Sequence, residues 1–284
     1  MIKEAVDDTL RDGLFELKVK GLCALKHPVE AFRCALLRDM NSLVKLREAY
    51  EREIVSAFLN SYSKRLDPYY YSTHDNRTLA NAICKFVTTV YPSMKHEIER
   101  EMHQMSLLLP FTEPYYVLLY QAVRLLRPKL ILETGVCRGY STCVLLKALS
   151  TLRSGHLYSI DLPSREYIRD DGTTHKDECD GYLVPDNLKV RWSLIFGDST
   201  HEMPKILHSI EKLDFFIHDS EHTYKVMMFE FAMAWEKLAE GGILVSDDID
   251  LSRAFYDFAR SVRKKPLILD RTNDRPRSIG IIVK

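Results

Sequence analysis

The sequence predicts an α/β fold in which a doubly wound, mostly parallel sheet of seven strands follows a helical N-terminal region. Short apolar runs alternate with amphipathic segments from about residue 106 onward, as expected for strands and the helices that cover them. Four of the first five runs end at or just before an acidic residue, and the third reaches one after a glycine. The last two runs are typical of an antiparallel hairpin, which would give the sheet an antiparallel C-terminal strand.

The expected elements follow one another through residues 106–284, which we assign to one domain. Strands are expected at 129–132, 156–160, 190–196, 214–218, 243–246, 266–269 and 278–283. Helices are expected at 114–126, 144–149, 203–213, 224–238 and 254–262, with a turn at Gly241–Gly242. The polar, acidic segment 165–185 has no clear periodicity, and we expect it to form a mobile lid over a ligand.

Residues 1–105 have a different pattern. Their apolar residues recur at three- and four-residue spacing, as at Phe32, Leu36, Met40, Leu43 and Val44. This spacing is typical of helices, and no strand is expected before residue 128. We therefore expect a helical cap or oligomerisation region, and its amphipathic character favours a homodimer.

Composition excludes several kinds of partner. Lys+Arg and Asp+Glu number 40 each, and a nucleic-acid-binding protein would carry an excess of basic residues. The six cysteines show no paired spacing, which favours reduced thiols over a disulfide framework or a zinc site. No signal-peptide pattern is seen, and no apolar run approaches the ~20 residues of a membrane span. We expect a cytoplasmic protein with no nucleic-acid partner and no membrane partner.

The first expected strand runs into a glycine turn with the sequence Glu-Thr-Gly-Val-Cys-Arg-Gly-Tyr-Ser at 133–141. Glycines suit a sharp turn that lets a ligand approach the backbone, and the helix start beyond it offers N–H groups to a carboxylate or phosphate. The spacing of Gly135 and Gly139 matches neither the dinucleotide motif nor the phosphate-binding loop. The turn therefore predicts a nucleotide-type ligand of another kind, and a dinucleotide oxidoreductase is the weakest alternative.

Acidic residues also follow the fourth and fifth strands, as Asp219 and as Asp247 with Asp248. Neighbouring strands lie about 4.8 Å apart, so these carboxylates are expected to face one another. Carboxylates that close repel unless one is protonated or a cation lies between them, and oxygen ligands suit Mg²⁺. The alternative is that these aspartates cap helices.

With these motifs in place, residues 110–284 resemble the class I S-adenosylmethionine-dependent methyltransferases, which have a Rossmann-like fold. Among them the chain is most similar to metal-dependent small-molecule O-methyltransferases of the catechol and macrolide-sugar types. The resemblance implies that the glycine turn holds the methionine part of the cofactor, that an acid holds the ribose, and that Gly197-Asp-Ser flanks the adenine. The implied cofactor contacts are Glu133, Gly135, Gly139, Ser141, Asp161, Asp198, Ser199 and Asp219.

The same resemblance implies a catalytic centre. Asp219, Asp247 and Asp248 match the acidic metal triad of the family, whose Mg²⁺ chelates substrate oxygens and lowers the pKa of the attacking hydroxyl. His222 occupies the position of the family's catalytic lysine and is the expected base, with helix capping or support of the residues that contact the ligand as its alternative roles. His218, inside the strand end, is expected to be a packed core residue.

Three functions are compatible with these features. The first is a Mg²⁺-dependent O-methyltransferase acting on a small hydroxylated acceptor such as a sugar, polyketide or phenol. The second keeps S-adenosylmethionine but no metal, with the aspartates in structural roles. The third is a catalytically silent cofactor-binding or assembly protein in which the N-terminal helices carry the function.

Overall fold

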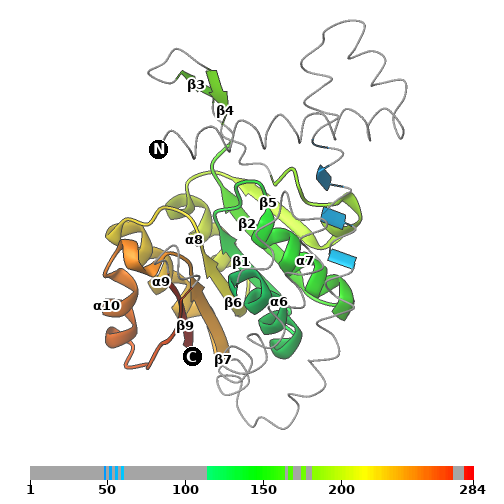
Figure 1. Ribbon diagram of the computed structural model, residues 1–284. Helices are drawn as coiled ribbons and strands as arrows, with labels where there is room; N and C mark the ends of the chain where they lie inside the picture. The colour runs from blue at the N-terminus through cyan, green and yellow to red at the C-terminus, as the bar shows by residue number, and fades with distance from the viewer. Residues whose placement is uncertain are drawn as a thin grey trace, which may run out of the picture.

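The computed structural model describes residues 48, 51–52, 55–56, 59–60, 114–163, 166–168, 174–176, 181–270 and 278–284. These residues form an α/β domain with helices on both faces of a seven-stranded sheet (Figure 1). The strands are β1 (Leu130–Thr134), β2 (His156–Asp161), β5 (Trp192–Phe196), β6 (Leu213–His218), β7 (Leu238–Ser246), β8 (Leu267–Asp270) and β9 (Ser278–Val283). The predicted fold class is confirmed.

The strands lie in the order β5-β2-β1-β6-β7-β9-β8. The first five are parallel to one another, whereas β9 runs antiparallel to both β7 and β8. The carboxyl ends of the parallel strands therefore meet at one edge of the sheet. The strand order changes direction at β1, which pairs with β2 on one side and β6 on the other, and ligands of open α/β sheets bind at such a point.

Two helical layers cover the sheet. The helices are α6 (Pro114–Leu126), α7 (Tyr140–Leu152), α8 (Ser199–Ser209), α9 (Tyr224–Lys237) and α10 (Ala254–Ser261), with 3₁₀ segments η3 (Asp186–Arg191) and η4 (Ile249–Leu251). In Figure 1, α6 and α7 lie on one face of the sheet, and α8, α9 and α10 lie on the other.

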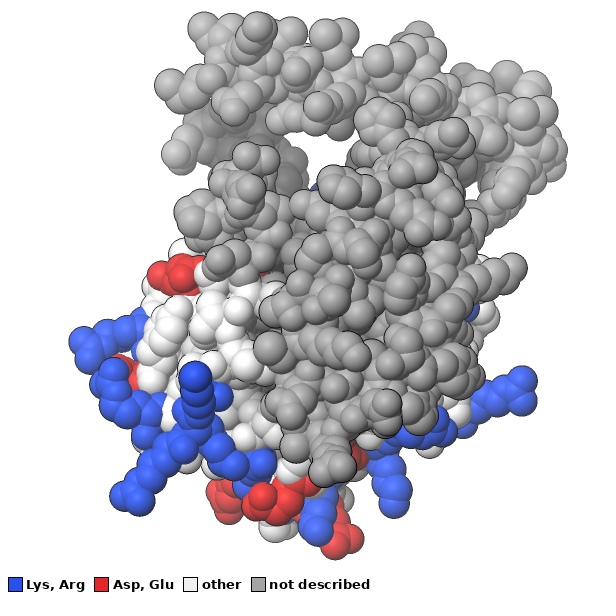
Figure 2. All heavy atoms as spheres, turned by 60° about the horizontal axis from the view of Figure 1, so that its bottom comes forward, with Lys and Arg blue, Asp and Glu red and all other residues white. Residues whose placement is uncertain are grey.

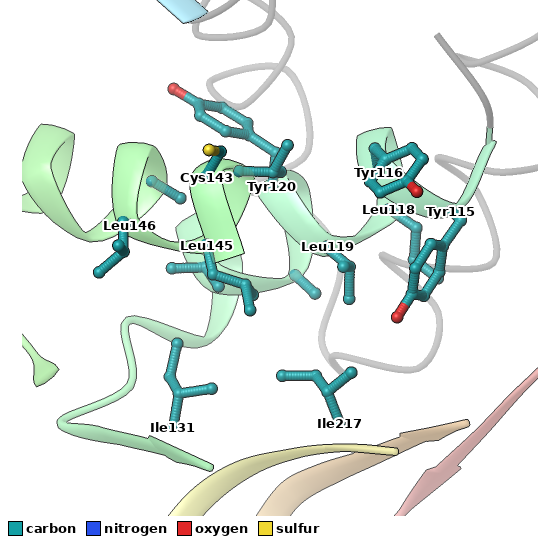
Figure 3. Close-up of a cluster of buried hydrophobic side chains, with 14 of the residues drawn as sticks. Tyr115, Tyr116, Leu118, Leu119, Tyr120, Ile131, Cys143, Leu145, Leu146 and Ile217 are labelled. Carbon is teal, nitrogen blue, oxygen red and sulfur yellow. The ribbon is translucent and has the colours of Figure 1, made fainter. Parts of the chain in front are cut away.

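Successive residues of each strand divide between these two faces. Ile131 packs in the core beneath α6 and α7, and its neighbour Leu132 packs in the core beneath α8 to α10. Figure 3 shows Ile131 and Ile217 pointing up from the sheet toward leucines of α6 and α7. Because burying one such side chain contributes about 1.5–3 kcal/mol, this two-sided packing holds the strand ends in fixed positions.

Several element boundaries differ from those expected. Helix α7 begins at Tyr140 because Gly139, with φ +96°, ends the glycine turn there. Helix α8 begins at Ser199 because the Asp198 carboxylate accepts from the N–H of Thr200 at 2.8 Å and caps it. The turn expected at Gly241–Gly242 is wrong, since both glycines lie inside β7, next to a register irregularity against β6.

The segment 165–185 is more regular than the sequence suggests. Strands β3 (Glu166–Ile168) and β4 (Thr174–Lys176) pair as a small antiparallel hairpin, which stands apart from the main sheet in Figure 1. Residues 181–184 are buried in the domain. An irregular loop over the whole segment is therefore wrong, and a mobile lid stays a prediction.

Most of residues 1–113 lie outside the described residues, so the helical region and the homodimer stay predictions. The described positions between 48 and 60 are helical, and Val55 and Leu59 are buried in the domain core.

Cys137 and Cys143 are free thiols, and the other four cysteines are not among the described residues. Across the described chain, no helix has both the length and the apolar character needed to cross a membrane. Figure 2 shows basic and acidic side chains intermixed on the described part of the face in view.

Candidate functional site

The carboxyl ends of β1, β2, β6 and β7 are joined by backbone hydrogen bonds beyond the regular ladders. The N–H of Asp219 donates to Thr134 O at 2.8 Å, and the N–H of Asp247 donates to His218 O at 2.9 Å. The N–H of Gly135 donates to Ile160 O at 2.9 Å. The glycine turn and the acids expected after β6 and β7 therefore lie along one edge, as predicted.

The glycine turn lies directly against the end of β6. Gly135 has φ +85°, and a Cβ built on it would lie 2.0 Å from the carbonyl oxygen of Asp219. No other residue fits there, because a Cβ would clash with backbone and φ is in the left-handed region. The predicted binding turn and the first predicted metal ligand are thus in backbone contact.

Asp161 lies at the end of β2 and holds the other side of the turn. Its Oδ2 accepts from the N–H groups of Val136 at 2.8 Å and Cys137 at 2.6 Å, and its Oδ1 accepts from Leu162 at 2.8 Å. Burial raises the pKa of Asp161, although these three amides lower it in part. The carboxylate thus fixes the shape of the turn, and its contact with a ribose stays a prediction.

Glu133 and Ser141 lie beneath the turn. The buried Glu133 carboxylate accepts from the hydroxyls of Ser141 at 2.6 Å, Thr142 at 2.8 Å and Ser159 at 2.7 Å. Burial raises the pKa of Glu133 to about 7, and the three hydroxyls oppose that effect. The hydroxyl of Ser141 is already engaged in its hydrogen bond to Glu133. The backbone N–H groups of the first turn of α7 are therefore better placed to bind a ligand carboxylate.

The residues expected near adenine, Asp198 and Ser199, follow β5. Asp198 caps α8 through Oδ1, and Ser199 hydrogen-bonds toward Glu230 of α9. Sequence reasoning missed two apolar neighbours, because an apolar residue at a strand end is usually buried. Leu162 is 44% exposed and Phe196 is 50% exposed, and the register places Phe196 opposite Asp161. This exposed apolar surface suits a flat ring.

Asp219 and Asp247 lie near a phenol that sequence reasoning also missed. The buried hydroxyl of Tyr115, on α6, donates to Asp219 Oδ2 at 3.5 Å. Burial raises the pKa of Tyr115 well above its usual value, and the charges of Asp219 and Asp247 raise it further. In the sequence nothing distinguishes Tyr115 from the adjacent Tyr116.

The three acids predicted to bind a metal are only partly brought together. Asp247 and Asp248 are buried, and Asp248 has the left-handed φ of +47°. Within the ranges that the structure describes, no group of three or more His, Cys, Asp or Glu side chains is placed to hold a metal ion. Metal binding by Asp219, Asp247 and Asp248 therefore stays a prediction.

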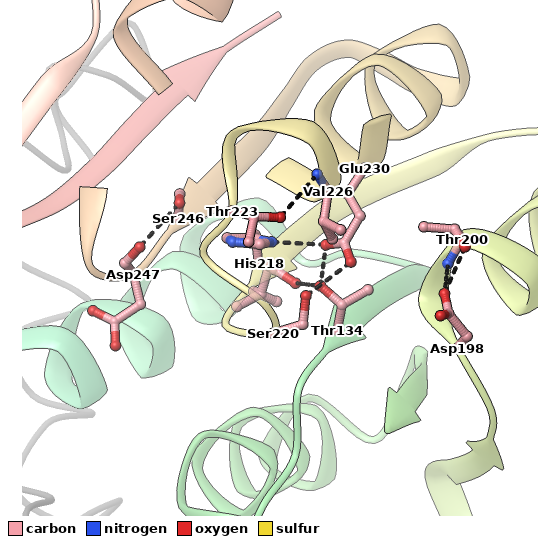
Figure 4. A network of polar contacts seen from close by, with 11 residues as sticks. Thr134, Asp198, Thr200, His218, Ser220, Thr223, Val226, Glu230, Ser246 and Asp247 are labelled. Carbon is pink, nitrogen blue, oxygen red and sulfur yellow. Dashed lines mark hydrogen bonds and ion pairs between the residues drawn. The ribbon is translucent and has the colours of Figure 1, made fainter. Parts of the chain in front are cut away.

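A buried polar network lies behind these acids (Figure 4). The Glu230 carboxylate is 2.7 Å from Nδ1 of His218 and accepts from the hydroxyls of Thr134 at 2.6 Å and Ser220 at 2.8 Å. Burial by itself would raise the pKa of Glu230, but the hydrogen bond and charge of His218 lower it overall. His218 is fully buried, as expected, but it makes a contact with the Glu230 carboxylate that the sequence pattern did not reveal.

His222 lies beside this network. Its ring packs edge-on against that of His218, with centroids 5.2 Å apart. The hydroxyl of Thr223 accepts from the N–H of Val226 and caps α9, so His222 does not have the capping role considered as its alternative. A catalytic role for His222 stays a prediction.

The chain is similar to one family model and to several solved structures. Residues 132–249 match the family model described as a methyltransferase domain. No curated protein matches the chain. The O-methyltransferase from Bacillus cereus in complex with SAH is 17% identical, with 73% of this chain and 98% of that chain covered and a TM-score of 0.46. The O-methyltransferase TomG from Streptomyces achromogenes, solved with SAM, is 18% identical, with 68% and 89% covered and a TM-score of 0.43.

The matched segment runs from β1 through β7 to the start of η4 and contains the glycine turn, Asp161 and Asp219. The sheet order and the matched family model define the class of protein. Residues 132–249 form a methyltransferase domain on a doubly wound, Rossmann-like sheet. At 17% and 18% identity, the two solved structures do not indicate which substrate this chain uses.

Proposed function

We propose that the chain transfers the methyl group of S-adenosylmethionine to an oxygen of a small hydroxylated molecule. The observation that carries this proposal is the backbone contact between Gly135 and Asp219. It joins the turn expected to hold the methyl donor to the strand end expected to hold the acceptor. The methyl group would therefore be presented at the edge shared by β1 and β6.

Candidate contacts for each part of the donor support the proposal. The first turn of α7 offers N–H groups to the methionine carboxylate, and Asp161 offers its carboxylate to the ribose. Leu162 and Phe196 offer exposed apolar surface to the adenine.

In this reaction the protein positions the acceptor oxygen against the methyl group and removes the hydroxyl proton of the acceptor. The acceptor oxygen forms a bond to the methyl carbon as the carbon–sulfur bond breaks, and S-adenosylhomocysteine leaves. The proton of the acceptor hydroxyl passes to the imidazole of His222.

Calorimetric titration with S-adenosylmethionine, followed by transfer of a labelled methyl group to a panel of phenols, sugars and polyketides, tests this proposal. We expect binding, and turnover on at least one acceptor class. His222→Asn is expected to bind the cofactor normally and to lower kcat by about 100-fold, because general base catalysis contributes 10²–10⁴-fold. His208→Asn, on the exposed side of α8, is the control and should leave kcat unchanged. Absence of cofactor binding overturns the proposal, and binding without turnover on any acceptor supports the catalytically silent alternative.

A second candidate is the Mg²⁺-assisted form of the same reaction. It is favoured by Tyr115, whose hydroxyl donates to Asp219 Oδ2 and whose pKa is also raised by the charge of Asp247, so that both carboxylates lie near the same phenol. These two carboxylates would hold the ion, which when bound would polarise the acceptor oxygen.

Metal dependence is tested on the same protein after treatment with EDTA. Loss of turnover that Mg²⁺ restores, together with loss of Mg²⁺ binding in Asp247→Asn by calorimetry, supports the Mg²⁺-assisted form. Full turnover in EDTA and an active Asp247→Asn variant support the metal-independent form.

A further inference from the structure

Residues 181–184 form a second layer on the glycine turn. The N–H of Gly181 donates to Cys137 O at 3.0 Å, and the N–H of Leu183 donates to Arg138 O at 3.1 Å. The approach is close, because a Cβ on Gly139 would lie 3.0 Å from Cγ2 of Val184 and 3.1 Å from Cα of Gly181. The position of this segment therefore helps to set the shape of the turn.

Two residues of the N-terminal region hold this segment through Tyr182. The Tyr182 hydroxyl donates to Glu51 Oε2 at 2.9 Å, and Nη1 of Arg52 donates to Tyr182 O at 3.2 Å. Glu51 is 6% exposed and Tyr182 is 8% exposed, so the first contact is a buried hydrogen bond to a carboxylate. Such bonds are stronger than neutral ones and fix geometry more firmly.

The contact belongs to a packed interface. Val55 and Leu59, one and two helical turns beyond Glu51, are fully buried in the core that also contains Tyr182, Leu183 and Val184. Glu51 also lies near the start of α7: burial raises the pKa of Tyr140, and the charge of Glu51 adds to that effect. The described residues between 48 and 60 therefore contact both the segment 181–184 and α7, the helix that begins at the turn.

We propose that Glu51 and Arg52 are positioning residues of the cofactor site, which hold residues 181–184 against the glycine turn through Tyr182 and so set the affinity for S-adenosylmethionine. The inference rests on the proposed function, since it requires the turn to bind this cofactor. It gives the N-terminal region a role in ligand binding in addition to any role as a cap or oligomerisation element.

Calorimetry on the full chain measures the dissociation constant for S-adenosylmethionine. Tyr182→Phe removes the hydroxyl and is expected to weaken binding about tenfold, as is Glu51→Ala, because hydrogen bonds to charged groups are worth a factor of this order. Glu51→Gln still accepts from Tyr182 and should recover most of the affinity. At saturating cofactor kcat should be unchanged in Tyr182→Phe, and amide hydrogen exchange should increase at residues 136–139.

Asn60→Ala is the matched control. Asn60 lies in the same N-terminal segment and accepts from Nζ of Lys147 on α7 at 2.7 Å, but this contact is exposed. Loss of that contact should leave the affinity for the cofactor unchanged. Wild-type affinity in Tyr182→Phe, or an equal loss in Asn60→Ala, overturns this inference while leaving the proposed function intact. Absence of binding by the wild-type protein overturns both.

Discussion

The α-carbon of Gly135 faces the carbonyl oxygen of Asp219 so closely that a Cβ would lie 2.0 Å from it. The two residues follow different strands, β1 and β6, and Asp219 also donates its N–H to Thr134 O. The neighbouring strand β6 therefore supports the glycine turn. A larger residue at Gly135 is expected to displace both the turn and Asp219.

Gly135→Ala is predicted to destabilise the fold by about 2–5 kcal/mol, from the cost of a left-handed backbone and of overpacking. Guanidinium unfolding measures the loss, and calorimetry should show greatly weakened cofactor binding. Gly241→Ala is the matched control, because Gly241 has φ +77° but no atom lies within 4 Å of its built Cβ. Only the backbone cost of about 1–2 kcal/mol is expected there. Equal losses in the two variants would contradict the role of the contact with Asp219.

Asp161→Ala is predicted to weaken binding of S-adenosylmethionine by roughly 10- to 100-fold, because it removes a carboxylate that accepts from two amides of the turn. Titration calorimetry measures the change. Glu211→Ala is the control, since this exposed acid lies in the connection between α8 and β6, at the amino end of that strand. An unaltered dissociation constant in Asp161→Ala would show that the turn binds the cofactor without this acid.

Glu133 makes stability depend on pH. Its pKa of about 7 in the folded protein lies above the value of 4.5 for an exposed glutamate, so folding favours the protonated form. This contribution is fully present below pH 4.5 and is lost as the pH rises through 7, by about 3 kcal/mol in total. Glu133→Gln should flatten the dependence in this window, which urea unfolding at pH 5, 6, 7 and 8 measures. If Glu133→Gln keeps the wild-type pH dependence, Glu133 is not the group that makes stability depend on pH.

Glu230→Ala is predicted to cost about 3–5 kcal/mol, because it leaves the buried His218 without its carboxylate partner. Chemical unfolding measures the loss. Glu236→Ala, an exposed acid on the same helix, should change stability by less than about 0.5 kcal/mol. A double-mutant cycle with His218→Phe should show strong coupling, and additive losses would mean that the pair does not act as a unit.

Much of the fold could be predicted because its signals are local. Alternation of apolar and amphipathic segments predicted each main-sheet strand, and residues 114–126 were predicted as the helix that is observed. Boundaries were less accurate where a cap or a neighbouring strand decides them, as at Asp198 and Gly241. The placement of Gly135, Asp161 and Asp219 on one edge followed from the rule that parallel strands end together.

The sequence by itself determined the class of fold, the glycine turn and the acids at the strand ends. Only the tertiary structure decided which side chains meet there. Tyr115 reaches Asp219 across 104 positions, and Glu51 reaches Tyr182 across 131. Periodicity and turn motifs arise from interactions between near neighbours in the chain, so the sequence pattern records them directly. Contacts over such separations depend on how helices pack against the sheet, and no local pattern distinguishes Tyr115 from Tyr116 or a buried Glu230 from an exposed Glu236.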